Sequence, residues 1–418
     1  MGEGRFEPLH VCHAIRNQRS AGVDLLREVI ALGLTQTVAW AASTYLIAIL
    51  AAPIARDLGI ATSTVFGAFS VSLVVMAISG PYAGRAIDRW GGRRVLVISN
   101  LVLAAGLVLL GYASNVAALF AAWCVLGVGM ALGLYEAAFA ALVRLHGANA
   151  RGPITGITLI AGFASTVGWP VTALLTGQYG WRASCFVWAA VHLAIALPIN
   201  ILCIPSGSTR AADATPPPPT AGDAPAAEHA SGYRRSFALL ALFGALTSFV
   251  TSAMAAHLPG LLLAAGATAV AALTASALLG PAQVAARLIE YLAARRYRFH
   301  PLLTARIATA CHPVAGIVLA LFGGTAHAAS FFAITHGAGN GMITIAKGTL
   351  PLAIFGAAGY GHRQGLLSIL GRGMQAIAPF AFGVVLELQG PRIALGLSVT
   401  LSLVALAALI ALRPTASG

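Results

Sequence analysis

Apolar stretches long enough to cross a lipid bilayer recur along almost the whole of this 418-residue chain. A helix needs roughly 20 apolar residues to span the hydrocarbon core, and breaking the sequence at its Gly, Pro and Arg clusters gives twelve such stretches. Charged residues make up only 9% of the chain, whereas a soluble domain carries about 25%. The sequence therefore predicts an all-α membrane protein with twelve transmembrane helices.

The predicted spans form two sets of six on either side of a polar segment. They cover about 29–52, 62–86, 93–113, 116–143, 153–176, 181–204, 236–262, 269–293, 301–324, 327–352, 363–387 and 390–412. The segment 205–235 includes the proline run Pro216–Pro219 and has too few apolar residues to offset its ordering entropy. We therefore expect a cytoplasmic leader (1–28), an N-terminal six-helix bundle (29–204), a flexible cytoplasmic linker (205–235), a C-terminal six-helix bundle (236–412) and a cytoplasmic tail (413–418).

The positive charge indicates how the chain lies in the membrane. Its net charge is +13, which in a soluble protein would suggest nucleic acid as a partner. If the amino terminus is cytoplasmic, eighteen arginines fall in cytoplasmic segments and three, Arg56, Arg182 and Arg392, fall in outside loops. Because positive residues concentrate on the cytoplasmic side, we expect a multi-pass protein of the inner membrane with both termini cytoplasmic. The charge then serves orientation and contact with anionic lipid, and we expect no nucleic-acid partner.

The sequence offers little for metal or enzyme chemistry. Its five cysteines are scattered without metal-ligand spacing, so neither disulfides nor a cysteine metal site is expected. His257 with Met254, and His336 with Met342, have the soft-ligand chemistry of copper sites, but single His and Met residues in apolar helices more often pack. No nucleotide loop, catalytic triad or zinc-binding helix motif is visible, so we expect no cofactor and no enzyme activity.

One short loop carries the densest charge in the chain. The segment 84–94 reads Gly-Arg-Ala-Ile-Asp-Arg-Trp-Gly-Gly-Arg-Arg, and glycines with arginines between two apolar runs indicate a tight turn on the cytoplasmic side. The spacing Gly-x-x-x-Asp-Arg-x-Gly-x-Arg-Arg resembles the signature loop between helices 2 and 3 of the major facilitator superfamily of transporters. The resemblance implies two six-helix bundles that work by alternating access. It also implies a gate that stabilises the outward-open state, made by Gly84, Asp88, Arg89, Arg93 and Arg94.

Two arginines inside predicted spans suggest a binding site, because an ionised group there costs about 2.5 to 3.5 kcal/mol. Gln283 lies one turn before Arg287, so a guanidinium and an amide share a face that can hold a carboxylate. The structural alternative is an internal pair between Arg287 and Glu290. Arg372 shares a helix face with Gln375, which likewise suggests that the pair binds an anionic ligand. The alternative for Arg372 is a structural role in polar packing.

Acidic Glu136 lies in the predicted fourth span. If it is buried, its carboxyl could exchange a proton during the transport cycle. The alternative is that Glu136 is a fixed partner of Arg89 or Arg144 at the cytoplasmic gate. Lys347, the only lysine, is expected to snorkel to the interface.

A narrower resemblance concerns the substrate. Helix 8 is similar to the Gly-x-x-x-Asp-x-x-x-Arg pattern of monocarboxylate porters, with Gln283 in place of Asp and Arg287 in place of Arg. The segment 151–162 resembles the start of their helix 5, and basic residues on helices 8 and 11 resemble the dicarboxylate site of oxalate and formate antiporters. Their acidic, lysine-bearing helix 1 is missing. The helix 4 motif of drug antiporters is also missing, since Trp123 stands where they have Arg.

These features together predict a secondary transporter that moves a small organic anion, a monocarboxylate or dicarboxylate, by alternating access. The coupling ion is the proton if Glu136 carries it, and we expect a monomer. A drug or metabolite/proton antiporter is the alternative, followed by a copper carrier. The candidate substrate-binding residues are Gln36, Tyr45, Gln283, Arg287, Asn340, Arg372 and Gln375.

Overall fold

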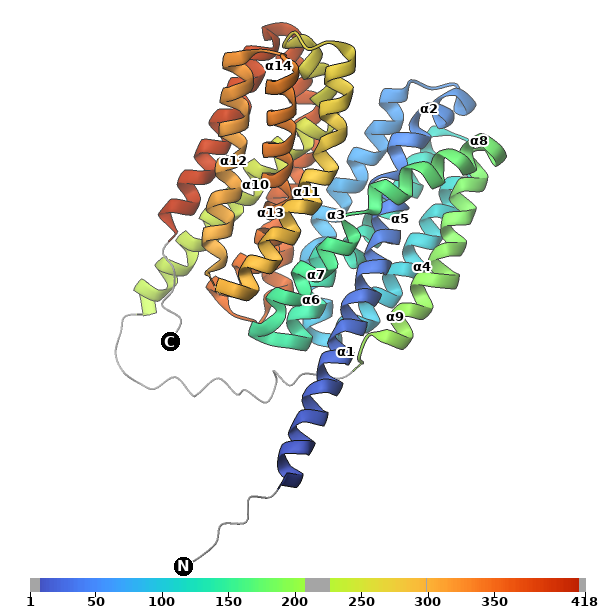
Figure 1. The fold of residues 1–418 in the computed structure, drawn as a ribbon. Helices are drawn as coiled ribbons and strands as arrows, with labels where there is room; N and C mark the ends of the chain where they lie inside the picture. The colour runs from blue at the N-terminus through green and yellow to red at the C-terminus, as the bar shows by residue number, and fades with distance from the viewer. Residues whose placement is uncertain (1–7, 207–225, 298, 413–418) are drawn as a thin grey trace, which may run out of the picture.

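The computed structural model describes residues 8–206, 226–297 and 299–412, and it consists of helices (Figure 1). The first half contains α1 (Pro8–Ala41), α2 (Leu46–Leu58), α3 (Thr62–Trp90), α4 (Gly92–Gly111), α5 (Val116–Gly133), α6 (Tyr135–His146), the 3₁₀ turn η1 (Gly147–Ala150), α7 (Arg151–Ala161), α8 (Ala164–Val191), the π-helix η2 (His192–Ala196) and α9 (Leu197–Cys203). The second half contains α10 (Ala226–Ala264), α11 (Ala269–Tyr297), α12 (Pro301–Phe322), α13 (Ala326–Phe355) and α14 (Tyr360–Ala411).

Each of the twelve predicted spans coincides with helix, although the helix boundaries divide them differently. The fifth and sixth spans meet inside α8 at Gly180, and the eleventh and twelfth meet inside α14 at Gly390. Both glycines have positive φ, 83° and 79°, which a residue with a side chain rarely adopts. The two halves therefore make the turn before their last span in the same way.

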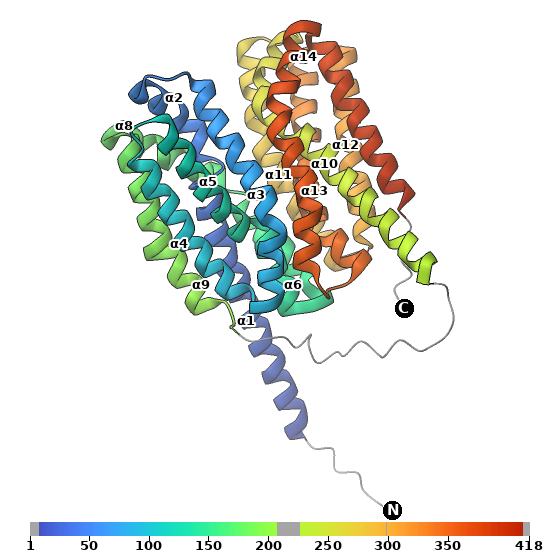
Figure 2. The same cartoon turned by 180° about the vertical axis from the view of Figure 1, so that it is seen from behind.

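Two bundles lie side by side, one from each half of the chain (Figures 1 and 2). Eight helices among the described residues are long and apolar enough to cross a membrane. Polar side chains such as Gln36, Lys347 and Arg372 lie on the other spans, in α1, α13 and the first half of α14. The prediction of an all-α membrane protein with two six-helix bundles is confirmed.

The bundles meet at one end and their ribbons diverge toward the other (Figure 1). Helix α3 packs along α14, α6 contacts α14, and α7 contacts α11 and α13. We call the end where they meet the closed end; it carries the α3–α4 and α13–α14 connections (Figure 2). A buried apolar cluster spans both bundles there, with Ile87 and Phe139 from the first half and Leu352 and Tyr360 from the second.

The polar segments differ from the sequence prediction at their boundaries. Helix α1 begins at Pro8, so most of the expected leader continues the first span as helix, while residues 1–7 lie outside the described residues. Helix α10 begins at Ala226, inside the expected linker 205–235, whose residues 207–225 lie outside the described residues. The expected tail 413–418 also lies outside them. Helix α10 starts earlier than expected because its first residues, Ala-Ala-Glu-His-Ala, include alanine and glutamate, which favour helix even without a long apolar stretch.

Candidate functional site

Asp88 joins the two bundles at the closed end. Its carboxylate accepts the backbone N–H groups of Gly361 (3.1 Å) and His362 (2.9 Å) in the first turn of α14. A carboxylate is favourable there because the first N–H groups of a helix have no intrahelical partner and carry the positive end of the helix dipole. Behind it, the guanidinium of Arg144 donates to the Asp88 carbonyl oxygen at the end of α3.

The other predicted gate residues divide into two groups. A Cβ on Gly84 would lie 1.9 Å from the carbonyl oxygen of Gly361, so this glycine allows α3 and α14 to touch at the backbone. Arg89 and Arg94 are exposed and Arg93 is half-buried, and within the described chain their side chains form no ion pair or hydrogen bond. The structure thus brings Gly84 and Asp88, but none of these arginines, into such contact with the second bundle.

A second pair across the bundles lies between α7 and α11. Arg151 contacts the Glu290 carboxylate at 2.8 Å and donates to the carbonyl oxygen of Phe299, over whose ring it also lies. Glu290 is only 4% exposed, and Thr304 donates to it at 3.3 Å. Glu290 is therefore committed to Arg151. The alternative sequence interpretation, an internal pair between Arg287 and Glu290, is wrong because a partner on another helix occupies the carboxylate.

Arg372 and Glu136 form the third contact across the bundles. Arg372 is 8% exposed, and its guanidinium donates to Glu136 Oε1 at 2.7 Å and to Gln375 Oε1 at 2.7 Å. Glu136 reaches it from the first turn of α6, which begins after the extended residue Leu134 interrupts the helix. The expected partners of Glu136, Arg89 and Arg144, are both wrong, since its partner comes from the other bundle.

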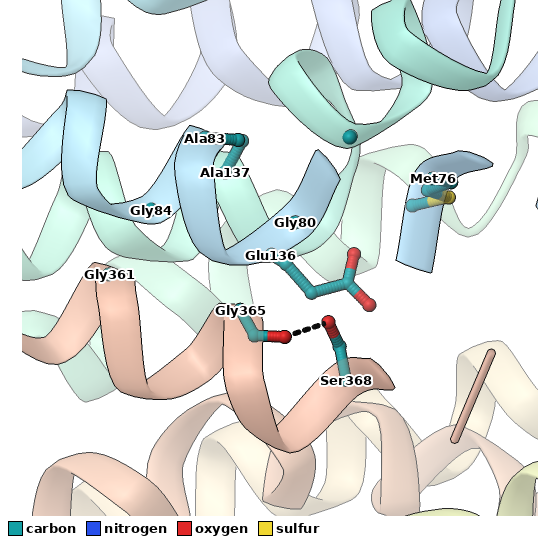
Figure 3. A pocket seen from close by; sticks show the side chains of 10 residues that line it. Met76, Gly80, Ala83, Gly84, Glu136, Ala137, Gly361, Gly365 and Ser368 are labelled. Carbon is teal, nitrogen blue, oxygen red and sulfur yellow. Dashed lines mark hydrogen bonds between the residues drawn. The ribbon is translucent and has the colours of Figure 1, made fainter. Parts of the chain in front are cut away.

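Figure 3 shows the surroundings of Glu136. Its side chain points into a small cavity between α3 and α14, lined also by Met76, Gly80, Gly365 and Ser368 (Figure 3). Ser368 donates to the Gly365 carbonyl oxygen at 2.8 Å. The second oxygen of the Glu136 carboxylate is buried and has no hydrogen-bond partner among the described residues. This oxygen is available to a proton or a water molecule.

Arg287 lies on α11 at the bundle interface and is 6% exposed. Its guanidinium donates to the carbonyl oxygens of Gly341 (3.3 Å) and Thr158 (3.1 Å) and to Gln283 Oε1 (3.4 Å). None of the ion pairs between described residues includes it. Gly162 makes room for the side chain, since a Cβ there would lie 2.6 Å from Arg287 Nη1. A buried cation with only uncharged acceptors is the result.

Aromatic residues of the first bundle gather near this cation. Tyr45 and Tyr135 both lie within electrostatic reach of Arg287. The Trp40 ring contacts both, with centroids 6.1 Å from Tyr45 and 5.0 Å from Tyr135. The Trp40 indole N–H is buried and has no hydrogen-bond partner among the described residues. Trp40 and Tyr135 were not among the substrate-binding residues predicted from the sequence. Tyr135 could have been identified, because it stands next to Glu136, an acidic residue inside a predicted span.

The remaining predicted residues lie in separate places. Asn340 accepts a hydrogen bond from Thr251 at 3.0 Å inside the second bundle. Gln36 is 1% exposed, donates to the Gly133 carbonyl oxygen at 2.5 Å, and lines a cavity inside the first bundle. Lys347 donates to Ser248 at 2.8 Å within the second bundle. Its side chain is therefore engaged there and does not snorkel to the membrane–water interface as expected.

The histidines of the copper alternative have packing partners. His257 shares a 2.7 Å hydrogen bond with the Pro379 carbonyl oxygen and lies near the Phe382 ring. His336 stacks on His312 with ring centroids 4.2 Å apart. Among the described residues, no group of three His, Cys, Asp or Glu side chains is placed to hold a metal ion. The structural interpretation of these histidines is therefore favoured.

The divergent end has an ion pair within the first bundle. Arg182 binds the Asp57 carboxylate and also donates to the carbonyl oxygen of Ala113 at 3.0 Å, while the Trp181 N–H donates to Asp57 at 3.3 Å. The Arg182 guanidinium holds the pKa of Asp57 below its usual range through a hydrogen bond and its charge. This pair connects α2, α8 and the α4–α5 connection, so it stabilises one bundle and does not join two.

Comparison with known proteins agrees with this architecture. Residues 32–379 match the family model of the Major Facilitator Superfamily, so the chain belongs to this family of membrane transporters. The human organic anion transporter MFSD10 (TETRAN) has the same fold, with a TM-score of 0.71 over 92% of this chain and 99% of that one at 17% identity.

Three curated relatives match over parts of the chain. The probable sulfoacetate transporter SauU of Cupriavidus necator is 32% identical over 149 residues, 34% of each chain. Mouse monocarboxylate transporter 14 is 34% identical over 130 residues, 30% of this chain and 24% of that one. A multidrug resistance protein B homolog of Mycobacterium tuberculosis is 30% identical over 165 residues, 39% of this chain and 29% of that one. The matches thus span about a quarter to a third of the relatives' lengths.

Proposed function

We propose that this transporter moves small organic anions, carrying one or two carboxylate or sulfonate groups, by alternating access between its two bundles. The observation that carries the proposal is Arg287, a buried guanidinium at the bundle interface with only neutral hydrogen-bond acceptors. Burying a charge without a counter-charge is costly. An anionic substrate supplies the missing charge, and the fork of the guanidinium suits a carboxylate.

The aromatic residues beside Arg287 complete the proposed site. Tyr45 and Tyr135 lie within electrostatic reach of the cation, and the buried Trp40 N–H, which has no hydrogen-bond partner among the described residues, would be a further donor for an anionic oxygen. Gln283 orients the guanidinium from one turn away. The two relatives whose names give an anionic substrate, a sulfoacetate and a monocarboxylate transporter, support the same substrate class.

Arg372 supports a second anion position. In the closed arrangement a carboxylate already occupies it, that of Glu136, with Gln375 as the neighbouring partner. A substrate carboxylate that takes this place would release Glu136, whose side chain points into the cavity between α3 and α14 and is our candidate for the proton carrier. Substrate and proton would thus be taken up together.

The closed end would be the cytoplasmic gate. It carries Asp88 and the arginine-rich loop, and positive residues favour the cytoplasmic side. With both termini cytoplasmic and the membrane the inner one, the described arrangement would be outward-facing. Inward opening would then break the bonds of Asp88 to α14 and the pairs Arg151–Glu290 and Arg372–Glu136.

Uptake into proteoliposomes of purified protein tests the proposal, with radiolabelled lactate, oxalate and sulfoacetate as probes. We expect Arg287→Gln and Arg372→Gln each to lower uptake about 30-fold or more, because losing one member of a buried charge pair costs about 2 kcal/mol or more. Arg306→Gln is the matched control: Arg306 donates to backbone carbonyl oxygens of Leu409 and Leu412 within one bundle. Unchanged uptake of every probe in both interface variants would refute the anion assignment.

Export of drugs is the second candidate, because a multidrug resistance protein aligns with part of the chain. Such an exporter would accept cationic or neutral compounds, which gain nothing from Arg287. Resistance of a sensitive host that survives Arg287→Gln would favour export of drugs over transport of anions.

A further inference from the structure

Lys347, the only lysine of the chain, has no role in the binding site proposed so far. It lies on α13, where its ammonium group donates to Ser248 Oγ on α10 at 2.8 Å. The side chain is half-buried, and none of the ion pairs between described residues includes it. An ionisable group in a membrane-spanning helix is costly and for that reason indicates a functional site. Lys347 thus has a hydroxyl partner but no carboxylate of its own.

A row of polar side chains connects α10, α13 and α14 around this lysine. Two turns before Lys347 on α13, Asn340 accepts a hydrogen bond from Thr251 of α10 at 3.0 Å. The next residue of α10, Ser252, donates to the carbonyl oxygen of Gln375 on α14 at 2.8 Å. The row therefore leads from Lys347 to the part of α14 that carries the second proposed anion position.

Ser248 brings the lysine close to that position. A Cβ on Gly371 would lie 3.2 Å from Ser248 Oγ. The hydroxyl that accepts from Lys347 therefore lies against α14, one residue before Arg372. The Lys347 charge is within electrostatic reach of both Arg372 and Glu136. Two cations of the second bundle consequently face a single carboxylate of the first.

Arg287 adds a third cation to the same stretch of the bundle interface. It donates to the carbonyl oxygen of Gly341 on α13, within two turns of Lys347. It also lies within electrostatic reach of Tyr135, which is next to Glu136 in the chain. The three positive groups are thus arranged around the contact between α6, α13 and α14.

The other acids at the interface are committed elsewhere. Glu290 binds Arg151, and Asp88 accepts backbone N–H groups at the start of α14. Among the described residues, Glu136 is therefore the one carboxylate that pairs with any of the three cations.

The positive charges consequently exceed the negative ones by two at this stretch. Burying a charge without a counter-charge is costly. A monoanion would leave one positive charge uncompensated, whereas a dianion balances both. Release and protonation of Glu136 would raise the excess by one more charge, so the need for a second negative charge persists when Glu136 takes up a proton.

We propose that the transporter selects dianions over monoanions, with Arg287 holding one acidic group of the substrate and Arg372 together with Lys347 holding the other. The fork of a guanidinium suits a carboxylate or sulfonate, and the lysine ammonium adds a point charge beside it. The substrate class is then small dicarboxylates and sulfocarboxylates with both groups ionised. The inference rests on the anion transport proposed above and adds Lys347 as the residue that sets the charge of the substrate.

Proteoliposome uptake of two nearly isosteric probes tests this selection. Sulfoacetate carries two negative charges, whereas methylsulfonylacetate has a methyl group in place of one sulfonate oxygen and carries one. We expect the wild-type protein to transport sulfoacetate with a kcat/KM about tenfold higher or more, because the second charge meets a buried cation. Malonate and lactate form a second pair of a dianion and a monoanion.

Lys347→Gln removes the charge and keeps a donor for Ser248. We expect the ratio of kcat/KM between dianion and monoanion to fall about tenfold or more, while uptake of the monoanion is retained. Lys347→Arg keeps the charge and should restore most of the ratio. Arg306→Gln is the matched control and should leave the ratio unchanged, because Arg306 donates to backbone carbonyl oxygens within one bundle. A merely structural lysine would lower uptake of both probes equally when replaced.

Two outcomes would overturn the proposal. One is a wild-type kcat/KM for the dianion that does not exceed that for the monoanion in either pair, a comparison that remains possible if Lys347→Gln fails to fold. The other is a ratio that Lys347→Gln leaves unchanged. Both would leave the transport of organic anions standing, since the monoanions would still be taken up. Absence of uptake of every probe would instead refute the proposed function itself, and the selection of dianions with it.

Discussion

Replacing Asp88 by Asn should loosen the closed end by a predictable amount. Asp88 accepts two backbone N–H groups of α14, at 2.9 and 3.1 Å, through two carboxylate oxygens. Asparagine keeps one acceptor oxygen and loses both the second acceptor and the charge at the helix N-terminus. A hydrogen bond to a charged group contributes about 1.5 to 3 kcal/mol and the charge at the helix end about 0.3 to 1 kcal/mol.

Part of this loss is recovered by water once the end opens, so we take a net cost of about 1 to 2 kcal/mol for closure. This corresponds to about a 5- to 30-fold higher equilibrium constant for opening. Amide hydrogen exchange measures it directly, because exchange of protected amides is proportional to the opening constant when reclosing is fast. Peptides that cover the start of α14 and the end of α3 should exchange about 5 to 30 times faster in Asp88→Asn.

Asp57→Asn is the control for this experiment. Asp57 also binds an arginine, but its partner Arg182 belongs to the same bundle at the divergent end. Exchange at the closed end should be unchanged in this variant. If Asp88→Asn leaves exchange at the start of α14 at the wild-type rate, the Asp88 contact does not hold the bundles together and the gate assignment is refuted.

Three further predictions follow from the described contacts. Gly84→Ala should abolish close packing of α3 on α14 and lower uptake into liposomes at least tenfold, because the added Cβ would overlap the Gly361 carbonyl oxygen. The control Gly152→Ala has open space around its Cβ and should transport normally in the same assay. Arg151→Gln should lower stability by about 3 to 5 kcal/mol, since it leaves buried Glu290 unpaired, and Glu290→Gln should cost less; thermal unfolding of both variants in detergent checks the order. The pKa of Asp57 is lowered from 3.8, so its contribution to stability is present well above the unfolded pKa and is lost as pH falls through the lower folded value. An acid titration of unfolding temperature should show this loss in wild type and not in Asp57→Asn.

Several parts of the site were predictable because their chemistry is local. An arginine in an apolar span is costly wherever it points, so Arg287 and Arg372 could be identified without knowing their neighbours. The neighbour one turn away could also be named: Gln283 and Gln375 do bond to these arginines. The charged loop at 84–94 likewise indicated the gate, and the contact of Asp88 with α14 agrees with it.

The partners of the acids could not be predicted in the same way. Glu290 stands three residues from Arg287, which makes an internal pair reasonable, yet it binds Arg151 from another helix. Glu136 was expected to meet Arg89 or Arg144 of its own bundle and instead meets Arg372. Both errors concern contacts between bundles, and periodicity within one helix contains no information on which helix of the other bundle lies opposite.

The sequence by itself determined that this is a membrane protein of two matched halves, because hydrophobic length and charge distribution act through transfer free energies of single segments. It also identified Arg287 and Arg372 as charges inside apolar spans, and both are buried. Only the tertiary structure decided how they pair, and it alone brought Gln36, Ser99 and Asn200 to one cavity. The reason is that helix packing joins residues from distant segments, where the direction of a side chain depends on the rotation of its helix and on the helix packed against it.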